Sequence, residues 1–225
     1  MKKIFLSAAL ISLCCILTAV CTGCSAGIAW NDYVSEYRSN IYEGSGENYD
    51  IFASFSVREY PYESDGYVGN LSTLFEVALS APDNTKTYDI TFSIDGKDYG
   101  GELSFDSVRM VHTFSQTLPE PEEQSISFLI GNAEDADEEA IEITANSIKN
   151  SETLGLYSLL NKAQENQKER FGAYIDGNSF KGEIYVRLLH ENDCYYYIGL
   201  IDRNGNIFSM LADAETGEIV ATREQ

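Results

Sequence analysis

The sequence predicts a mainly β protein with an α+β C-terminal part, and three observations support this fold class. From Tyr49 to about Thr144, short segments rich in β-branched and aromatic residues alternate with turn signals. One amphipathic helix is indicated at 152–170, and three further β segments follow it. We therefore expect an immunoglobulin-like antiparallel β-sandwich over 49–146, then a small domain over 147–225 with a helix on a three-stranded antiparallel sheet.

The N-terminus has the pattern of a secretory signal. Lys2 and Lys3 provide a positive end, and residues 4–21 form an apolar run that only Ser and Thr interrupt. A plain transmembrane helix is the alternative, because the run approaches the roughly 20 residues that span a bilayer. Both readings place the rest of the chain outside the cytoplasmic membrane.

Four cysteines, Cys14, Cys15, Cys21 and Cys24, lie in or beside this apolar run. A zinc site is disfavoured because no second cysteine pair or histidine cluster completes four ligands. The stretch "VCTGCSAG" resembles the lipobox of bacterial lipoproteins. The resemblance implies that residues 1–23 are a signal peptide, that Cys24 is lipidated, and that this lipid anchors the chain on the extracytoplasmic face of the cell membrane. Cys21 stands where that family usually has Leu, so cleavage before Cys21 or an uncleaved anchor also stays open.

Charge narrows the range of partners. Loss of Lys2 and Lys3 with the signal takes the formal net charge from −21 to −23. Such a body repels nucleic acid, anionic head groups and wall teichoic acids, so we expect no nucleic-acid partner. The charge either keeps a tethered protein soluble or forms a site for divalent cations or a basic partner. Cys194 would be the one remaining thiol, expected as a small buried hydrophobe outside any disulfide.

Residues 24–48 are interpreted as a tether and a short N-terminal segment. Five apolar residues recur at helical spacing, namely Trp30, Tyr33, Val34, Tyr37 and Ile41. A short helix ended by Gly44 is therefore expected, although the β-branched and aromatic content also suits a strand. The following "EGSGEN" reads as a turn, because its glutamates would repel a phosphate.

Within 49–146, Asp95-Gly96 is the clearest hairpin turn, and "TLPEPEEQ" is a long connection between strands. The acidic "AEDADEEA" places Asp135, Asp137 and Glu139 like the start of an EF-hand loop. Ala140 and Asn146 stand where that loop needs Gly and a bidentate Glu. We therefore interpret the stretch as a solvated loop between two strands.

In the C-terminal part, Ser151 is expected to cap the helix and Gly172 to end it. Its buried face would consist of Leu156, Leu159, Leu160 and Ala163. Asn204-Gly205 predicts a hairpin between the last two of the three strands.

The end of the chain, "IDRNGNIFSMLADAETGEIV", resembles the end of the PepSY domain family in five residues: Asp213, Thr216, Gly217, Glu218 and Ile219. The resemblance implies a helix packed on a small antiparallel sheet, and a role in binding or in restraining proteases. The motif also has a purely structural explanation. Gly217 would supply a positive φ, and Asp213 and Thr216 would bind nearby backbone amides.

Catalytic chemistry is poorly supplied. His112 and His190 are the only histidines and are expected to be structural, and no nucleophile, metal or phosphate-loop motif occurs. Tyrosines such as those at 195–197 suit the cover of a small sheet. We therefore expect a noncatalytic binding or accessory module at the cell surface, with no catalytic residue, cofactor or metal, whose partner is a surface or secreted protein or a wall component. The alternative is a surface hydrolase that uses paired carboxylates.

Overall fold

The computed structural model describes residues 28–63, 65–135 and 137–224. The predicted signal segment, its cysteines and the lipobox-like stretch lie outside the described residues. Within the described ranges, no helix is long and apolar enough to cross a membrane.

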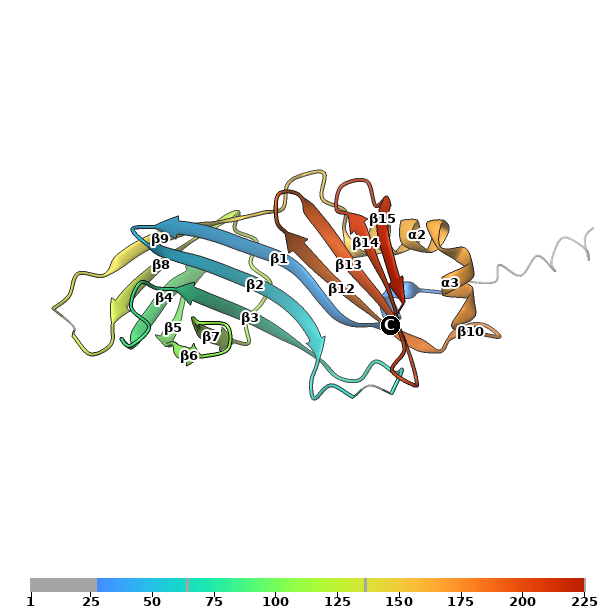
Figure 1. Cartoon of the computed structure of the whole chain (residues 1–225), viewed down its shortest axis with the longest axis horizontal. Coiled ribbons are helices and arrows are strands. Elements are labelled where there is room, and N and C mark those ends of the chain that lie inside the picture. Colours follow the sequence, from blue (N-terminus) through green and yellow to red (C-terminus); the bar gives the residue numbers. More distant parts are fainter. Residues whose placement is uncertain (1–27, 64, 136, 225) are drawn as a thin grey trace, which may run out of the picture.

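The described chain is mainly β, and its large, mostly antiparallel sheet is nearly closed into a barrel at one end of the molecule (Figure 1). The barrel strands are β1 (Val34–Gly46), β2 (Tyr49–Glu59), β3 (Leu71–Ser80), β4 (Tyr88–Ile94), β5 (Lys97–Glu102), β6 (Ser104–Asp106), β7 (Val111–Gln116), β8 (Ser125–Asn132) and β9 (Ile141–Ser147). Hydrogen bonds order them β6-β7-β3-β2-β1-β9-β8-β4-β5. Strand β4 shows how the sequence forms such a sheet. Its apolar residues alternate with polar ones, and every apolar residue is buried while every polar one is exposed. The buried side chains, which include Tyr42, Phe75, Phe92 and Phe128, form the barrel core.

The sheet continues past β1 into a second part at the other end of the molecule (Figure 1). Its antiparallel strands are β12 (Gly182–His190), β13 (Cys194–Asp202), β14 (Ile207–Asp213) and β15 (Ile219–Glu224). β12 pairs with β1 in parallel, with Val186 opposite Tyr37. The short strands β10 (Ile175–Asp176) and β11 (Ser179–Phe180) form a separate pair. This part therefore has four antiparallel strands rather than the expected three.

Two α-helices, α2 (Leu156–Asn166) and α3 (Lys168–Ala173), pack on this second part. Leu159, Leu160 and Ala163 of α2 are fully buried, and they join a cluster that includes Ile184 and Val186 of β12. We call this cluster the helix core. The expected packing of a helix on an antiparallel sheet is confirmed.

Strand β1 belongs to both cores. Successive strand residues point to opposite faces of a sheet. Accordingly, Ile41 lies in the helix core and the adjacent Tyr42 lies in the barrel core. The helix expected from Trp30 to Gly44 is wrong, because only Trp30–Tyr33 form a 3-10 turn, η1, before β1 begins. Pairing with β2, β9 and β12 supplies hydrogen bonds that a helix would have had to supply internally.

The helix expected at 152–170 is shorter and is broken. Ser151 is not its cap, because the side-chain Oδ1 of Asn150 accepts the backbone amides of Glu152 and Thr153 at 2.8 and 3.0 Å and forms a turn there. α2 begins only at Leu156, and it ends before Gln167, whose ψ of 42° separates it from α3. Gly172 lies inside α3 and does not end the helical segment.

The expected turns are largely confirmed. Asp95 and Gly96 take φ values of 51° and 69° between β4 and β5, as the hairpin prediction requires. Asn204-Gly205 joins β13 and β14, although only Gly205 has a positive φ, of 81°. Residues 117–124 form no strand and connect β7 to β8 as expected.

The C-terminal turn has the expected structural explanation. Gly217 has a φ of 72°, and the Oδ1 atom of Asp213 accepts the Thr216 amide at 2.7 Å. The Thr216 hydroxyl in turn accepts the Glu218 amide at 3.2 Å. These contacts hold the pKa of the Asp213 carboxyl below its usual range, mainly through Thr216.

Candidate functional site

A pocket of ≈ 420 Å³ lies at the seam where the barrel meets the second part of the sheet. It is formed by the start of β1, the end of β2, β12 and the segment that follows β2. The side chains used below that line it are Ser35, Glu59, Tyr60, Tyr62, Tyr185 and Arg187. We call it the seam pocket.

Two buried carboxylates lie at this place: Glu59 lines the seam pocket, and Glu183 does not line it but contacts its lining residue Tyr62. Glu183 of β12 is 0 % exposed, and its Oε1 atom accepts a hydrogen bond from the Tyr62 hydroxyl at 2.9 Å. Glu59 at the end of β2 is 7 % exposed and is bound by the backbone amide of Gly69. A Cβ atom at Gly69 would displace the Glu59 carboxylate, so this glycine lets the loop lie close to the Glu59 side chain.

Two buried carboxylate oxygens at this place, Glu59 Oε2 and Glu183 Oε2, lack a hydrogen-bond partner. The hydroxyl of Ser35, a residue that is 1 % exposed, makes no hydrogen bond of good geometry either, although it lies close enough to Glu183 to lower the pKa of that carboxyl. Across the described residues, six buried side-chain nitrogen or oxygen atoms are in this condition, so half of them gather at the seam pocket. Leaving a buried polar atom without a partner costs about 1–3 kcal/mol, which folded proteins rarely tolerate without a reason. The concentration of such atoms is what singles out this pocket.

Burial raises the pKa of both carboxyls. For Glu183, desolvation outweighs the opposing effect of the nearby Ser35 and Tyr62 hydroxyls. For Glu59, desolvation outweighs the Gly69 amide, and the negative charges of Glu183 and the following loop add to the rise. Both carboxyls therefore keep their protons to a higher pH than an ordinary glutamate.

The arginine of β12 at this pocket is already paired. Arg187 donates from Nε and Nη2 to the two carboxylate oxygens of Glu36 at 2.6 Å each, a bidentate arrangement. Its guanidinium also lies 5.4 Å from the centre of the Tyr185 ring. The pair with Glu36 raises the pKa of Arg187 and offsets its charge locally.

The segment between β2 and β3 is tied to the second part of the sheet. The Tyr62 ring packs edge-on against Tyr185, with ring centres 5.8 Å apart. Further along, the Arg203 guanidinium lies 4.4 Å from the centre of the Tyr67 ring. The first contact places Tyr62 beside β12, and the second links the segment to the turn between β13 and β14.

A larger pocket of ≈ 530 Å³ lies beside α3. Arg170 at this pocket pairs with Glu224 at 2.5 Å, and the Tyr174 hydroxyl donates to the Leu200 carbonyl at 3.1 Å. Arg170 also covers the ring of Phe208 at 4.9 Å from its centre. This pocket contains none of the unpartnered atoms described above, so it is the weaker candidate.

The two histidines occupy separate settings. His112 is 1 % exposed and packs against the rings of Tyr88 and Phe105, and desolvation lowers its pKa. His190 at the end of β12 lies with its Nδ1 atom 2.8 Å from Glu43 Oε2. Neither lines the seam pocket.

Cys194 is partly buried and is not in a disulfide. Its thiol lies 3.6 Å from the Ile148 carbonyl, and burial followed by the repulsion of nearby carboxylates raises its pKa. A nucleophilic cysteine needs the opposite shift, so this environment suits a structural residue.

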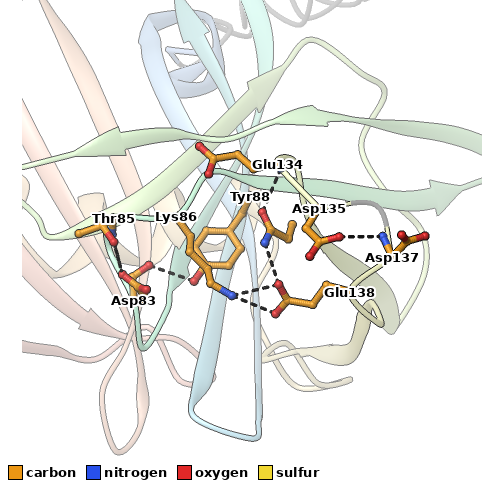
Figure 2. Close-up of polar contacts among 9 residues, drawn as sticks. Asp83, Thr85, Lys86, Tyr88, Glu134, Asp135, Asp137 and Glu138 are labelled. Atoms are coloured by element: carbon orange, nitrogen blue, oxygen red, sulfur yellow. Dashed lines mark hydrogen bonds and ion pairs between the residues drawn. The ribbon is translucent and has the colours of Figure 1, made fainter.

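The acidic stretch at 133–140 is an exposed loop between β8 and β9, as expected (Figure 2). Glu138 pairs with Lys86 at 3.0 Å and accepts the Asn132 amide at 2.7 Å, and the Asp137 backbone amide binds Asp135 Oδ1 at 3.1 Å. These carboxylates bind donors of the chain itself and do not converge on a common point where a metal ion could bind. Among the described residues, no group of three or more His, Cys, Asp or Glu side chains could hold a metal ion.

The remaining sequence-based interpretations concern tyrosines and turns. Tyr196 is fully buried and donates to the Leu154 carbonyl at 2.9 Å, while the Tyr197 hydroxyl lies 2.9 Å from Ser209 Oγ on β14. These tyrosines cover the sheet, as expected. Of "EGSGEN", residues 43–46 are the end of β1, and only Glu47 and Asn48, both with positive φ, form the turn to β2, so the expected turn is confirmed for these two residues.

Neither Glu59 nor Glu183 is identified as a candidate site residue by its sequence pattern. In "GEIYVRLL" the glutamate alternates with apolar residues and has the pattern of a solvent-facing position. Comparison with known protein families and with curated proteins finds no match for this chain.

Proposed function

We propose that this chain is a noncatalytic binding or accessory module, held on the extracytoplasmic face of a bacterial membrane by a lipid on Cys24. The binding role is carried by one observation, the two buried carboxylate oxygens without partners at and beside the seam pocket. Binding sites are commonly concave and carry a few convergent polar groups, and a ligand with suitable donors would satisfy Glu59 Oε2, whose residue lines the pocket. The pocket volume of ≈ 420 Å³ falls within the usual range of about 300–1,000 Å³ for small-molecule sites.

The finer assignments of the two parts belong to this proposal. The immunoglobulin-like arrangement of 49–146 and the PepSY-like character of 147–225 remain predictions. α2 on an antiparallel sheet and the turn built by Asp213, Thr216 and Gly217 support the latter. A PepSY-like part would agree with a role in binding a surface or secreted protein.

A surface hydrolase is the second candidate, because Glu59 and Glu183 are close enough for the charge of one to raise the pKa of the other. Two features oppose it. Glu183 is completely buried beneath Tyr62, out of reach of a substrate bond. Glycoside hydrolysis also needs one carboxylate that stays ionised while the other is protonated, whereas burial raises the pKa of both here.

The binding role is tested with the full chain purified in a neutral detergent. Ligand-observed NMR against a mixed library of cations, anions, neutral sugars and aromatic compounds should find at least one class that binds the wild type and is lost in Tyr62→Ala. Tyr157→Ala is the matched control, because Tyr157 is 70 % exposed on α2 and does not line the pocket. If no class depends on Tyr62, the seam pocket is not a binding site.

The anchor is tested in cells with a clickable palmitate analogue. We expect the wild type and Cys21→Ser to be labelled and Cys24→Ser to lose the label. Label that survives Cys24→Ser and disappears in Cys21→Ser would move the anchor to Cys21.

A further inference from the structure

The unpartnered atoms at the seam pocket define what a ligand must offer. Glu59 Oε2 and Glu183 Oε2, when ionised, can only accept hydrogen bonds, and the Ser35 hydroxyl can also accept one. Glu59 lines the pocket, so a ligand that satisfies Glu59 Oε2 carries N–H or O–H donors, whereas Glu183 lies beneath Tyr62 and acts on the ligand only through its charge. Ammonium and guanidinium groups meet this requirement. Their positive charge would also compensate the negative charge of the buried carboxylates.

The charges around the pocket favour a cation. The acidic groups acting on the buried pair are Glu63 and Asp65 of the loop, which raise the pKa of Glu59. The basic and neutral titratable groups that line the pocket are Arg58, Arg187, Tyr60, Tyr62 and Tyr185. Glu36 binds Arg187 through both of its carboxylate oxygens and so offsets its charge. Among the residues that line the pocket, Arg58 is then the one basic side chain that faces the carboxylates of Glu59, Glu183, Glu63 and Asp65. Arg58 itself is exposed on β2.

The aromatic lining adds a second attraction. Tyr60 and Tyr62 are 68 % and 46 % exposed at the pocket, so their rings remain accessible to a ligand. A cation over a tyrosine ring gains about 0.5–2 kcal/mol. The chain already places two of its own guanidinium groups on tyrosine rings, Arg187 on Tyr185 at the pocket and Arg203 on Tyr67 further along the segment after β2.

We propose that the seam pocket binds an organic cation with N–H donors, an ammonium or guanidinium group, either free or as the basic side chain of a peptide. This inference rests on the proposed binding function and names its ligand class. A metal ion fits less well, because among the described residues no three His, Cys, Asp or Glu side chains lie together in a way that could hold one. An anion would have to approach two buried carboxylates.

The test is calorimetric titration of the full chain in neutral detergent with three probes of matched shape. These are the N-acetyl, N′-methylamide derivatives of lysine, arginine and the neutral norleucine. We expect the two cations to bind and the norleucine derivative not to bind. A tri-lysine peptide, compared with the single residue, distinguishes a free cation from a peptide side chain by whether the longer probe binds more tightly.

Two variants and one control localise the binding. Glu59→Gln keeps the shape of the side chain and should weaken both cations at least tenfold, while Tyr60→Ala should weaken them without altering the buried pair. Glu139→Gln removes one exposed charge from the distant acidic loop and should leave the affinity unchanged. Because burial disfavours the ionised form of Glu59, its replacement by glutamine should not lower the free energy of unfolding at about pH 8, so lost binding would not reflect lost folding.

The pH dependence adds an independent readout. A bound cation favours the ionised carboxylates, so affinity should rise from about pH 5 to about pH 8 in the wild type and less in Glu59→Gln. Equal binding of the norleucine probe, or equal weakening by Glu139→Gln, would overturn the inference. If the mixed library finds only anions or neutral sugars at this pocket, the proposed cationic ligand class is wrong, but the proposed binding function stands. If nothing binds there, both fail.

Discussion

Replacing Ile41 by alanine tests whether β1 unites the two parts of the molecule. Ile41 is 1 % exposed in the helix core, and Tyr42 beside it lies in the barrel core. The substitution removes three buried carbon atoms and leaves a cavity. Lost apolar burial and the cavity together should lower the free energy of unfolding by about 2–5 kcal/mol. With a urea m-value of about 1–3 kcal/mol/M, the unfolding midpoint should fall by roughly 1 M.

The assay follows the two cores separately. Trp30 is the only tryptophan and packs edge-on against Phe171 at 4.9 Å, so its fluorescence reports the helix core. Hydrogen exchange of the β8 amides, measured by mass spectrometry, reports the barrel core. Because β1 hydrogen-bonds into both parts, we expect both probes to shift by the same free energy in Ile41→Ala, and neither to shift in Val220→Ala, which is 51 % exposed. If Trp30 alone responds and β8 is unchanged, the two parts unfold independently and the reasoning is refuted.

Three further predictions concern stability. Leu160→Ala should cost about 2–5 kcal/mol in urea unfolding because Leu160 is fully buried, whereas the exposed Glu165→Ala should cost little; equal costs would contradict the packing of α2. Gly217→Val should lower the thermal midpoint, because its φ is 72° and a Cβ there would crowd the α2 side of the turn; an unchanged midpoint would argue against this strain. His112 has a lowered pKa in the fold, so the unfolded chain binds the proton more readily. The free energy of unfolding should therefore fall as pH drops below about 6.5, and fall less in His112→Gln; parallel pH profiles would show that His112 is not the cause.

Local features of the sequence predicted the turns and the buried helix face. Asp95-Gly96 and Gly217 adopt the positive φ values that their residue types suggest, because such turns depend on a few adjacent residues. The apolar spacing of Leu159, Leu160 and Ala163 likewise identified the face of α2 that packs on the sheet. These predictions needed no knowledge of distant contacts.

Features that depend on distant contacts could not be read from the sequence. The apolar residues of β1 fit a helical spacing, and only pairing with β2, β9 and β12 decides in favour of a strand. Glu183 accepts a hydrogen bond from Tyr62, which lies 121 residues earlier in the chain. Gly44 reads as a helix end, yet its role is to let β9 approach, since a Cβ there would press against the Thr144 carbonyl at 2.5 Å. The seam pocket is built entirely from such contacts.

The most direct test of the seam pocket is carbon-13 NMR of the Glu59 and Glu183 carboxyl groups in the full chain, followed as a function of pH. We expect both signals to titrate above the value of about 4.3 for a glutamate in a model peptide, because burial and missing partners penalise the charged form. Addition of the arginine probe should move both titrations to lower pH. Titration of both groups at the peptide value, with no response to the probe, would contradict a buried carboxylate pair that awaits a cation.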